Sequence, residues 1–273
     1  MMYLFVFLAL VLLACLWYID KQTRFFTPAG NKLRVLEYHS ISTDGFEDQI
    51  TISKEKFITQ LNYLKSEGYT TMWLSEIDDY QQKRKGLPPK TVVLTFDDGY
   101  ANNYTELFPL LKQYGMKATC FMVLGRIGQN IDWAGKYVND SMQLMNKSQL
   151  QEINSHIEVA HHTFKHDNYT KITLDEVDDD LKQSNAVIET EKLNVFPALA
   201  YTFGRYYRKK GEKQTRLFAI LKQNGIKYAF RIGNRINKFP LNSFYDIQRT
   251  DIRGTDSMDD FKTKLRFGRN KLF

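Results

Sequence analysis

The sequence predicts an α/β fold built on a parallel sheet. Short runs rich in β-branched and aromatic residues, typical of buried strands, alternate along the chain with longer helical stretches. Strands that alternate with helices indicate a parallel sheet, because parallel strands need long crossover connections. At 273 residues the chain fits one α/β domain. The pattern alone leaves open a closed barrel or an open doubly wound sheet.

The expected elements follow one another in a regular order. The strands are predicted at residues 33–38, 91–96, 117–124, 156–161, 198–203 and 227–232. The helices between them are predicted at residues 54–67, 103–114, 147–155, 174–190 and 213–224. The run 83–89 is expected to form a polar turn before the strand at 91–96. The acidic residues 175–180 suit the start of a solvated helix, where carboxylates complement the helix dipole.

The N-terminal segment predicts a membrane anchor. Met1 to Ile19 is almost wholly apolar and long enough to cross a hydrocarbon core of about 30 Å. A basic start and a small-residue cleavage site, both typical of a signal peptide, are missing, although an uncleaved signal stays the alternative. We therefore expect an anchor at residues 1–19, a linker at 20–32 and one domain at 33–273.

Charge and cysteine content indicate little about partners. The formal charge of +7 is spread along the chain, which suits an anionic envelope or glycan, and no nucleic-acid-binding motif accompanies it. Cys15 lies in the anchor and Cys120 in an apolar run, so the two are not expected to pair. The sequence carries no signal for an oligomeric state.

Two motifs carry the chemistry. Asp97 and Asp98 end the strand-like run at 91–96, and His162 and His166 follow the run at 156–161. Two imidazoles and a carboxylate suit a divalent transition metal, zinc first and cobalt, nickel or iron as alternatives, with positions left for water and substrate. Successive strand side chains diverge, so the Asp pair can serve one centre only if the chain turns, which Gly99 permits.

Other interpretations of these motifs remain open. Asp-Asp-Gly after a strand is also typical of a plain turn or a helix N-cap, and a histidine pair four residues apart also occurs on solvated surfaces. A two-histidine, one-carboxylate site also suits a non-haem iron oxygenase, although the second aspartate would then have no role.

The residues resemble the NodB-homology polysaccharide deacetylases, carbohydrate esterase family 4, and especially the subgroup that deacetylates poly-N-acetylglucosamine. The matching blocks are residues 33–39, 57–69, 95–99, 108–121, 162–166 and 200–204. The resemblance implies an irregular (β/α) barrel with its site at the carboxyl ends of the strands. It also implies a metal-dependent hydrolase that removes N-acetyl groups from an N-acetylhexosamine polysaccharide. A catalytically silent glycan-binding relative is the alternative.

Within this resemblance, Asp97 matches the catalytic base, and Asp98, His162 and His166 match the metal ligands. Many family members carry their general acid near the C-terminus, but no histidine follows His166 here. We therefore expect His39, which matches a Tyr-His block of the subgroup, to be the acid, with a structural histidine as the alternative.

The third block departs from the commoner Tyr-Pro-Tyr-Gly of the subgroup, with Thr202 and Phe203 in the middle positions. The backbone N–H of Phe203 is expected to stabilise the oxyanion, and Tyr201 and Arg205 to bind substrate. The exported glycans on which the family acts favour an extracytoplasmic domain, whereas Lys21 and Arg24 after the anchor favour the cytoplasm. We expect the outer side.

Overall fold

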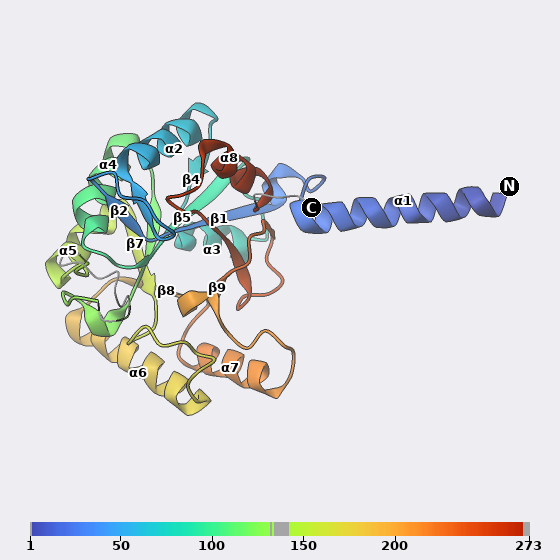
Figure 1. Ribbon diagram of the computed structural model, residues 1–273. Coiled ribbons are helices and arrows are strands. Elements are labelled where there is room, and N and C mark those ends of the chain that lie inside the picture. The colour runs from blue at the N-terminus through green and yellow to red at the C-terminus, as the bar shows by residue number, and fades with distance from the viewer. Residues whose placement is uncertain (1, 132, 134–141, 270–273) are drawn as a thin grey trace.

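The computed structural model describes residues 2–131, 133 and 142–269, in which parallel strands close into a barrel (Figure 1). Strand β1 (Lys32–Tyr38) pairs in parallel with both β5 (Thr91–Asp98) and β11 (Ile247–Asp251). From β5 the circuit returns to β11 through β6 (Ala118–Met122), β7 (Ile157–His161), β8 (Val195–Ala200) and β9 (Tyr228–Ile232). The fold is therefore the irregular (β/α) barrel, and the pairings of β1 exclude the open sheet.

Helices other than the N-terminal one surround this barrel, and short strands flank it. The helices are α1 (Met2–Thr23), α2 (Lys54–Ser66), α3 (Leu74–Gln82), α4 (Phe108–Tyr114), α5 (Lys147–Glu152), α6 (Leu174–Glu191), α7 (Glu212–Gln223) and α8 (Met258–Phe267). The short strands are β2 (Ser40–Ser42), β3 (Thr51–Ser53), β4 (Thr70–Thr71) and β10 (Asn237–Lys238).

All six expected strands and all five expected helices are present, with shifted ends. Strand β8 ends at Ala200 because the residues after it turn into a 3₁₀ helix, Thr202–Gly204. The helix expected at 103–114 begins with a π-helical turn, Asn103–Leu107. Strand β11 escaped prediction because Ile-Gln-Arg-Thr-Asp has a single aliphatic residue and lacks the pattern of a buried strand.

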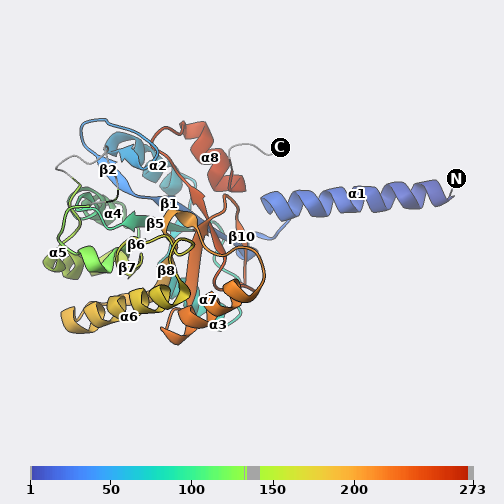
Figure 2. The same cartoon turned by 60° about the horizontal axis from the view of Figure 1, so that its bottom comes forward.

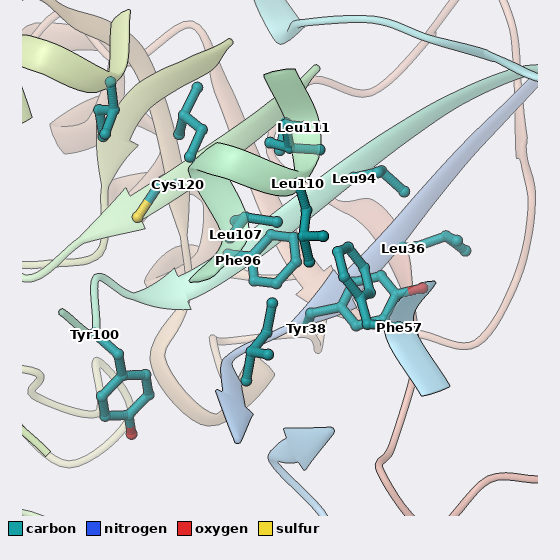
Figure 3. Close-up of a cluster of buried hydrophobic side chains, with 14 of the residues drawn as sticks. Leu36, Tyr38, Phe57, Leu94, Phe96, Tyr100, Leu107, Leu110, Leu111 and Cys120 are labelled. Atoms are coloured by element: carbon teal, nitrogen blue, oxygen red, sulfur yellow. The ribbon is translucent and has the colours of Figure 1, made fainter. Parts of the chain in front are cut away.

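The alternation of side chains along the strands separates the barrel interior from the outer core. Val35 and Val93 belong to the cluster inside the barrel. Their neighbours Leu36 and Leu94 belong to the outer cluster, where Tyr38 and Phe96 pack against Phe57 of α2 with ring centroids 5.1–5.7 Å apart (Figure 3). Because side chains alternate along β5, Asp97 lies on the same, inward side of the strand as Val93, and Asp98 lies on the other side.

Helix α1 projects away from the barrel (Figure 2). Among the described residues it is the one helix long and apolar enough to cross a membrane, a property that a signal sequence shares. It extends four residues beyond the expected anchor, to Thr23. Cys15 and Cys120 are both free thiols, as expected. The outermost predicted domain limits, residues 1 and 273, lie outside the described residues.

Candidate active site and metal-binding cluster

The backbone turns at the end of β5, where the two aspartates lie. Asp98 has a left-handed φ of 71° and Gly99 one of 84°. A Cβ at Gly99 would lie 2.1 Å from the sulfur of Met122, so this turn needs glycine. The predicted turn is therefore present, and it begins at Asp98, one residue before Gly99.

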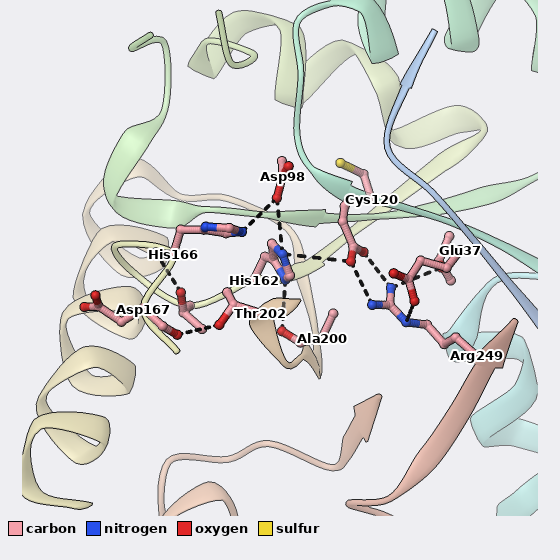
Figure 4. A network of polar contacts seen from close by, with 12 residues as sticks. Glu37, Asp98, Cys120, His162, His166, Asp167, Ala200, Thr202 and Arg249 are labelled. Carbon is pink, nitrogen blue, oxygen red and sulfur yellow. Dashed lines mark hydrogen bonds and ion pairs between the residues drawn. The ribbon is translucent and has the colours of Figure 1, made fainter. Parts of the chain in front are cut away.

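His162 and His166 meet Asp98 at the carboxyl end of β7. The Nε2 atoms of His162 and His166 each lie 3.2 Å from Oδ1 of Asp98, and all three side chains are buried (Figure 4). The loop that makes this possible is strained, since Thr163 and His166 have φ values of 64° and 67°. Residues 64 positions apart in the sequence thus form one cluster whose three ligand atoms lie within 4.8 Å of one another.

The chemistry of this cluster fits a divalent metal. Nδ1 of His162 donates to the carbonyl of Ala200 at 2.9 Å, and because a carbonyl only accepts, the neutral form of this ring has its lone pair on Nε2, which faces Asp98. Oδ1 of Asp98 is buried without a hydrogen-bond donor. Burial alone would raise the pKa of Asp98, but the neighbouring histidines hold it well below its ordinary value. An ionised carboxylate and two imidazole nitrogens therefore converge, a donor set typical of zinc.

Asp97 is held by an arginine that the sequence analysis missed. Arg249, from β11, is fully buried and donates from Nη1 and Nη2 to the two carboxylate oxygens of Asp97 at 2.5 and 2.7 Å (Figure 4). Its Nε forms an ion pair with Glu37 at 3.1 Å, outside hydrogen-bond alignment. Burial would raise the pKa of Asp97, but Arg249 outweighs it and keeps that pKa lowered. Burial raises the pKa of Glu37 to about 7.

One signal in the sequence could have pointed to this arginine. Glu37 is the acidic residue of the strand-like run 33–38, and an acid on the buried side of a strand needs a cationic or hydrogen-bonding partner. The identity of that partner was hidden, because β11 lies more than 200 residues away in a polar segment.

His39 lies beside Asp97 at the end of β1. One ring nitrogen of His39 and one carboxylate oxygen from each of Asp97 and Glu37 lie within 4.8 Å of one another. The side chain is half-buried, so it borders both the site and solvent. Asn103, in the π-helical turn, donates to the carbonyl of His39 at 3.0 Å and fixes its backbone. The position is one from which a side chain can reach a substrate next to Asp97.

Aromatic rings border the imidazole of His166 on two sides. Trp133 stacks on it with a centroid distance of 4.3 Å, and Phe203 meets it edge-on at 4.9 Å. Phe203 is 54% exposed and has a left-handed φ of 57°. The hydroxyl of Thr202 donates to the carbonyl of Asp167, which ties the third block to the His166 loop where the commoner pattern has a proline.

The remaining predicted residues differ in their positions. Tyr201 is 1% exposed, stacks on Tyr206 at 4.7 Å and donates its hydroxyl to the carbonyl of Tyr245. Its side chain thus packs in the core, which corrects the expectation that it contacts substrate. Arg205 is exposed directly after the third block. His161 is buried, and burial lowers its pKa to about 4.

Comparison with known proteins gives the family. A family model described as polysaccharide deacetylase matches residues 84–229. The protein YxkH of Bacillus subtilis (strain 168) is 30% identical over 176 residues, covering 64% of this chain and 58% of that protein. The poly-beta-1,6-N-acetyl-D-glucosamine N-deacetylase of Staphylococcus aureus (strain N315) is 25% identical over 201 residues, which cover 71% of this chain and 66% of that protein. The chain thus spans about three fifths to two thirds of these curated relatives.

Solved structures share the fold at lower sequence identity. The Streptococcus pyogenes deacetylase PplD, in complex with acetate, superposes with a TM-score of 0.70 at 22% identity, covering 86% of this chain and 98% of that chain. IcaB from Ammonifex degensii superposes with a TM-score of 0.69 at 22% identity, covering 87% and 97%. With the family model matching more than half of the sequence, the chain belongs to the polysaccharide deacetylase family, whose members are hydrolytic enzymes.

Proposed function

We propose that this protein is a metal-dependent N-deacetylase of an N-acetylhexosamine polysaccharide, such as poly-β-1,6-N-acetylglucosamine. The observation that carries the proposal is the convergence of Asp98, His162 and His166 beside Asp97. The Staphylococcus aureus relative, which is named as an enzyme of this activity, supports the choice of substrate.

The metal site is proposed to consist of Asp98, His162 and His166, with zinc the first candidate and cobalt, nickel and iron the alternatives. A divalent cation bound there lowers the pKa of water and polarises an acetamide carbonyl. The hydrogen bond from Nδ1 of His162 to Ala200 supports this role, since a fixed tautomer and ring orientation are typical of metal-binding histidines.

Asp97 is proposed as the general base. The paired hydrogen bonds from Arg249 orient its carboxylate and keep it ionised, the state that can accept a proton from the attacking water. Arg249 is a positioning residue in this scheme, because it contacts Asp97 and acts through it. Asp97 also lies 3.9 Å from Nε2 of His162, beside the proposed metal site.

His39 is proposed to act on the leaving amine, and Phe203 on the oxyanion. His39, next to Asp97, protonates the departing amine so that the C–N bond can break. The backbone N–H of Phe203 stabilises the developing oxyanion. Arg205, exposed after the third block, is proposed to contact the glycan.

Helix α1 is proposed to anchor the protein in a membrane, with the barrel on the extracytoplasmic side. Its length and apolar composition support the anchor, and the exported glycans on which the family acts support the outer side.

The test is acetate release by the full chain in detergent. Poly-N-acetylglucosamine, chitin oligomers and peptidoglycan are each supplied after chelator treatment and after addition of zinc, cobalt, nickel or iron. We expect turnover on at least one glycan that chelator abolishes and metal restores. No acetate from any glycan with any metal would contradict the proposal and favour a silent glycan-binding relative. An oxygen-dependent product with iron would favour an oxygenase.

A further inference from the structure

We propose that a basic surface around the end of α1 binds the anionic lipid headgroups of the bilayer that α1 enters, and so holds the barrel against the membrane. The surface, here called the basal patch, comprises Lys21, Arg24, Lys32, Arg235, Lys238 and Arg266. The inference rests on the proposed anchoring role of α1 and is independent of the deacetylase reaction.

Contacts couple the end of α1 to the barrel. The carboxylate of Asp20 accepts hydrogen bonds from the backbone N–H groups of Phe26 and Thr27 and from the Thr27 hydroxyl, at 2.8–2.9 Å. Nε of Arg24 donates to the carbonyl of Ile236 at 3.4 Å, across 212 residues of sequence. The segment after α1 is therefore folded onto the barrel, which places one end of the barrel close to the point where α1 would leave the lipid.

Cations from four elements meet at this end. Lys32 of β1 lies opposite Lys238 of β10 in the antiparallel register. Gly268, two residues after Arg266, packs so closely on the backbone of Arg235 that a Cβ there would lie 2.6 Å from its Cα. The end of α8 thus joins the same surface as Lys32, Lys238 and Arg235.

The positive charge of the basal patch is largely uncompensated. None of the ion pairs found among the described residues includes a member of the patch. Burial, and then the neighbouring Arg269, Arg231 and Arg24, lower the pKa of Arg235, as expected where like charges crowd. Burial and the neighbouring Arg34 and Arg266 lower the pKa of Lys32, and the carboxylate of Asp20 opposes this shift. Such a cluster attracts an anionic partner within about a Debye length, roughly 10 Å.

Aromatic residues next to the patch identify that partner as a bilayer. Phe25 and Phe26, directly after α1, are each 56% exposed, and Trp17 and Tyr18 are exposed in its last turns. Aromatic rings at the end of an apolar span, followed by cations, are typical of the interface between hydrocarbon and headgroups. A soluble polyanion would account for the cations but not for the exposed phenylalanines beside the span.

This attachment directs the site away from the lipid. Strand β1 begins at Lys32 in the basal patch and leads to His39 at the site, a rise of roughly 20 Å at 3.3 Å per residue. The site lies at the carboxyl ends of the strands and therefore at the other end of the barrel from the basal patch. A glycan that extends from the membrane can reach it, whereas a sugar attached directly to a lipid of the same bilayer cannot.

The experiment uses the full chain in nanodiscs. Cys15 is replaced by serine, Cys120 is fully buried, and Lys238→Cys carries a bimane fluorophore. Quenching by a phosphatidylcholine with a headgroup spin label is compared in neutral discs and in discs with about one third phosphatidylglycerol. We expect at least ~2-fold stronger quenching in the anionic discs, because the basal patch draws residue 238 to the headgroups.

A variant with Lys32→Gln, Arg235→Gln and Arg266→Gln should lose this difference between lipids. The matched variant, with Lys171, Lys209 and Lys210 changed to glutamine, removes three exposed lysines from loops at the far end of the barrel and should retain it. Equal quenching in the two lipids, or equal effects of the two variants, would overturn the proposal. If the first variant does not fold, the comparison of quenching between the two lipids in the labelled parent still tests the proposal.

The two proposals fail separately. Acetate release from a soluble glycan oligomer should be the same in the basal-patch variant as in the parent, because the patch lies far from the site. Lipid-dependent quenching without acetate release would contradict the proposed reaction and leave the basal patch standing. Acetate release without lipid-dependent quenching would contradict the basal patch and leave the proposed reaction standing.

Discussion

Arg249→Met tests the central electrostatic feature of the barrel. The guanidinium is 0% exposed and lies between Asp97 and Glu37 inside the barrel. Methionine keeps much of the apolar stem but removes the charge and the donors. Two buried carboxylates then face one another without the guanidinium between them.

The expected loss of stability is large. Removing one partner of a buried ion pair costs about 3–5 kcal/mol, which in a chain of this size lowers the melting temperature by roughly 6–20 °C. The loss should grow as the pH rises, because carboxylates with raised pKa values destabilise the fold once they ionise. In the parent, Asp97 has the opposite effect on the pH dependence of stability. Its pKa is lowered, so its contribution to the free energy of unfolding is present above the ordinary carboxyl pKa and is lost as the pH falls through the lowered value.

The assay is thermal unfolding of the full chain at about pH 6 and pH 8, with bound metal measured alongside. Arg253→Met is the matched control, since Arg253 pairs with Asp251 at 2.8 Å but its side chain is 45% exposed, and such pairs contribute about 1 kcal/mol or less. Adding Glu37→Gln to Arg249→Met should recover part of the loss. A melting temperature for Arg249→Met no lower than that of the control would refute the reasoning.

Three further predictions concern the site and its support. Asp98→Asn should lose both metal and acetate release, whereas Asp97→Asn should keep metal, measured by elemental analysis, and lose catalysis; equal metal loss in both would contradict the division of roles. His39→Ala should lose roughly 10²–10⁴-fold in rate on the acetamide with metal retained, and much less on an acetyl ester with a phenol leaving group, whereas equal losses would indicate a structural histidine. Asp180 of α6 accepts hydrogen bonds at 3.0 Å from the backbone N–H of Phe164, in the loop that leads to His166. Burial raises the pKa of Asp180 to about 6, so its ionisation destabilises the fold as the pH rises through that value. Asp180→Asn should therefore flatten the melting temperature between about pH 5 and pH 7, and an unchanged profile would show that Asp180 does not titrate there.

The sequence by itself indicated the candidate metal cluster and six of the parallel barrel strands, but not β11. Asp98 and His162 each follow an apolar run, and such runs are recognisable locally because a buried strand must present apolar side chains at nearly every position. Once the strands are taken as parallel, their carboxyl ends must share one edge of the sheet. The meeting of these two motifs therefore follows from local patterns and a general rule of topology.

Only the tertiary structure decided which residues support that cluster. Arg249 comes from a polar strand without a recognisable pattern, and its role exists because β11 pairs with β1 across more than 200 residues. Tyr201 is expected from the third block to bind substrate, but packing buries its ring against Tyr206. The left-handed backbone of Asp98 also depends on the surrounding contacts. Local sequence encodes which side chains can be buried, whereas the partner of a buried charge and the cost of a strained backbone are set by residues that meet only after the chain has folded.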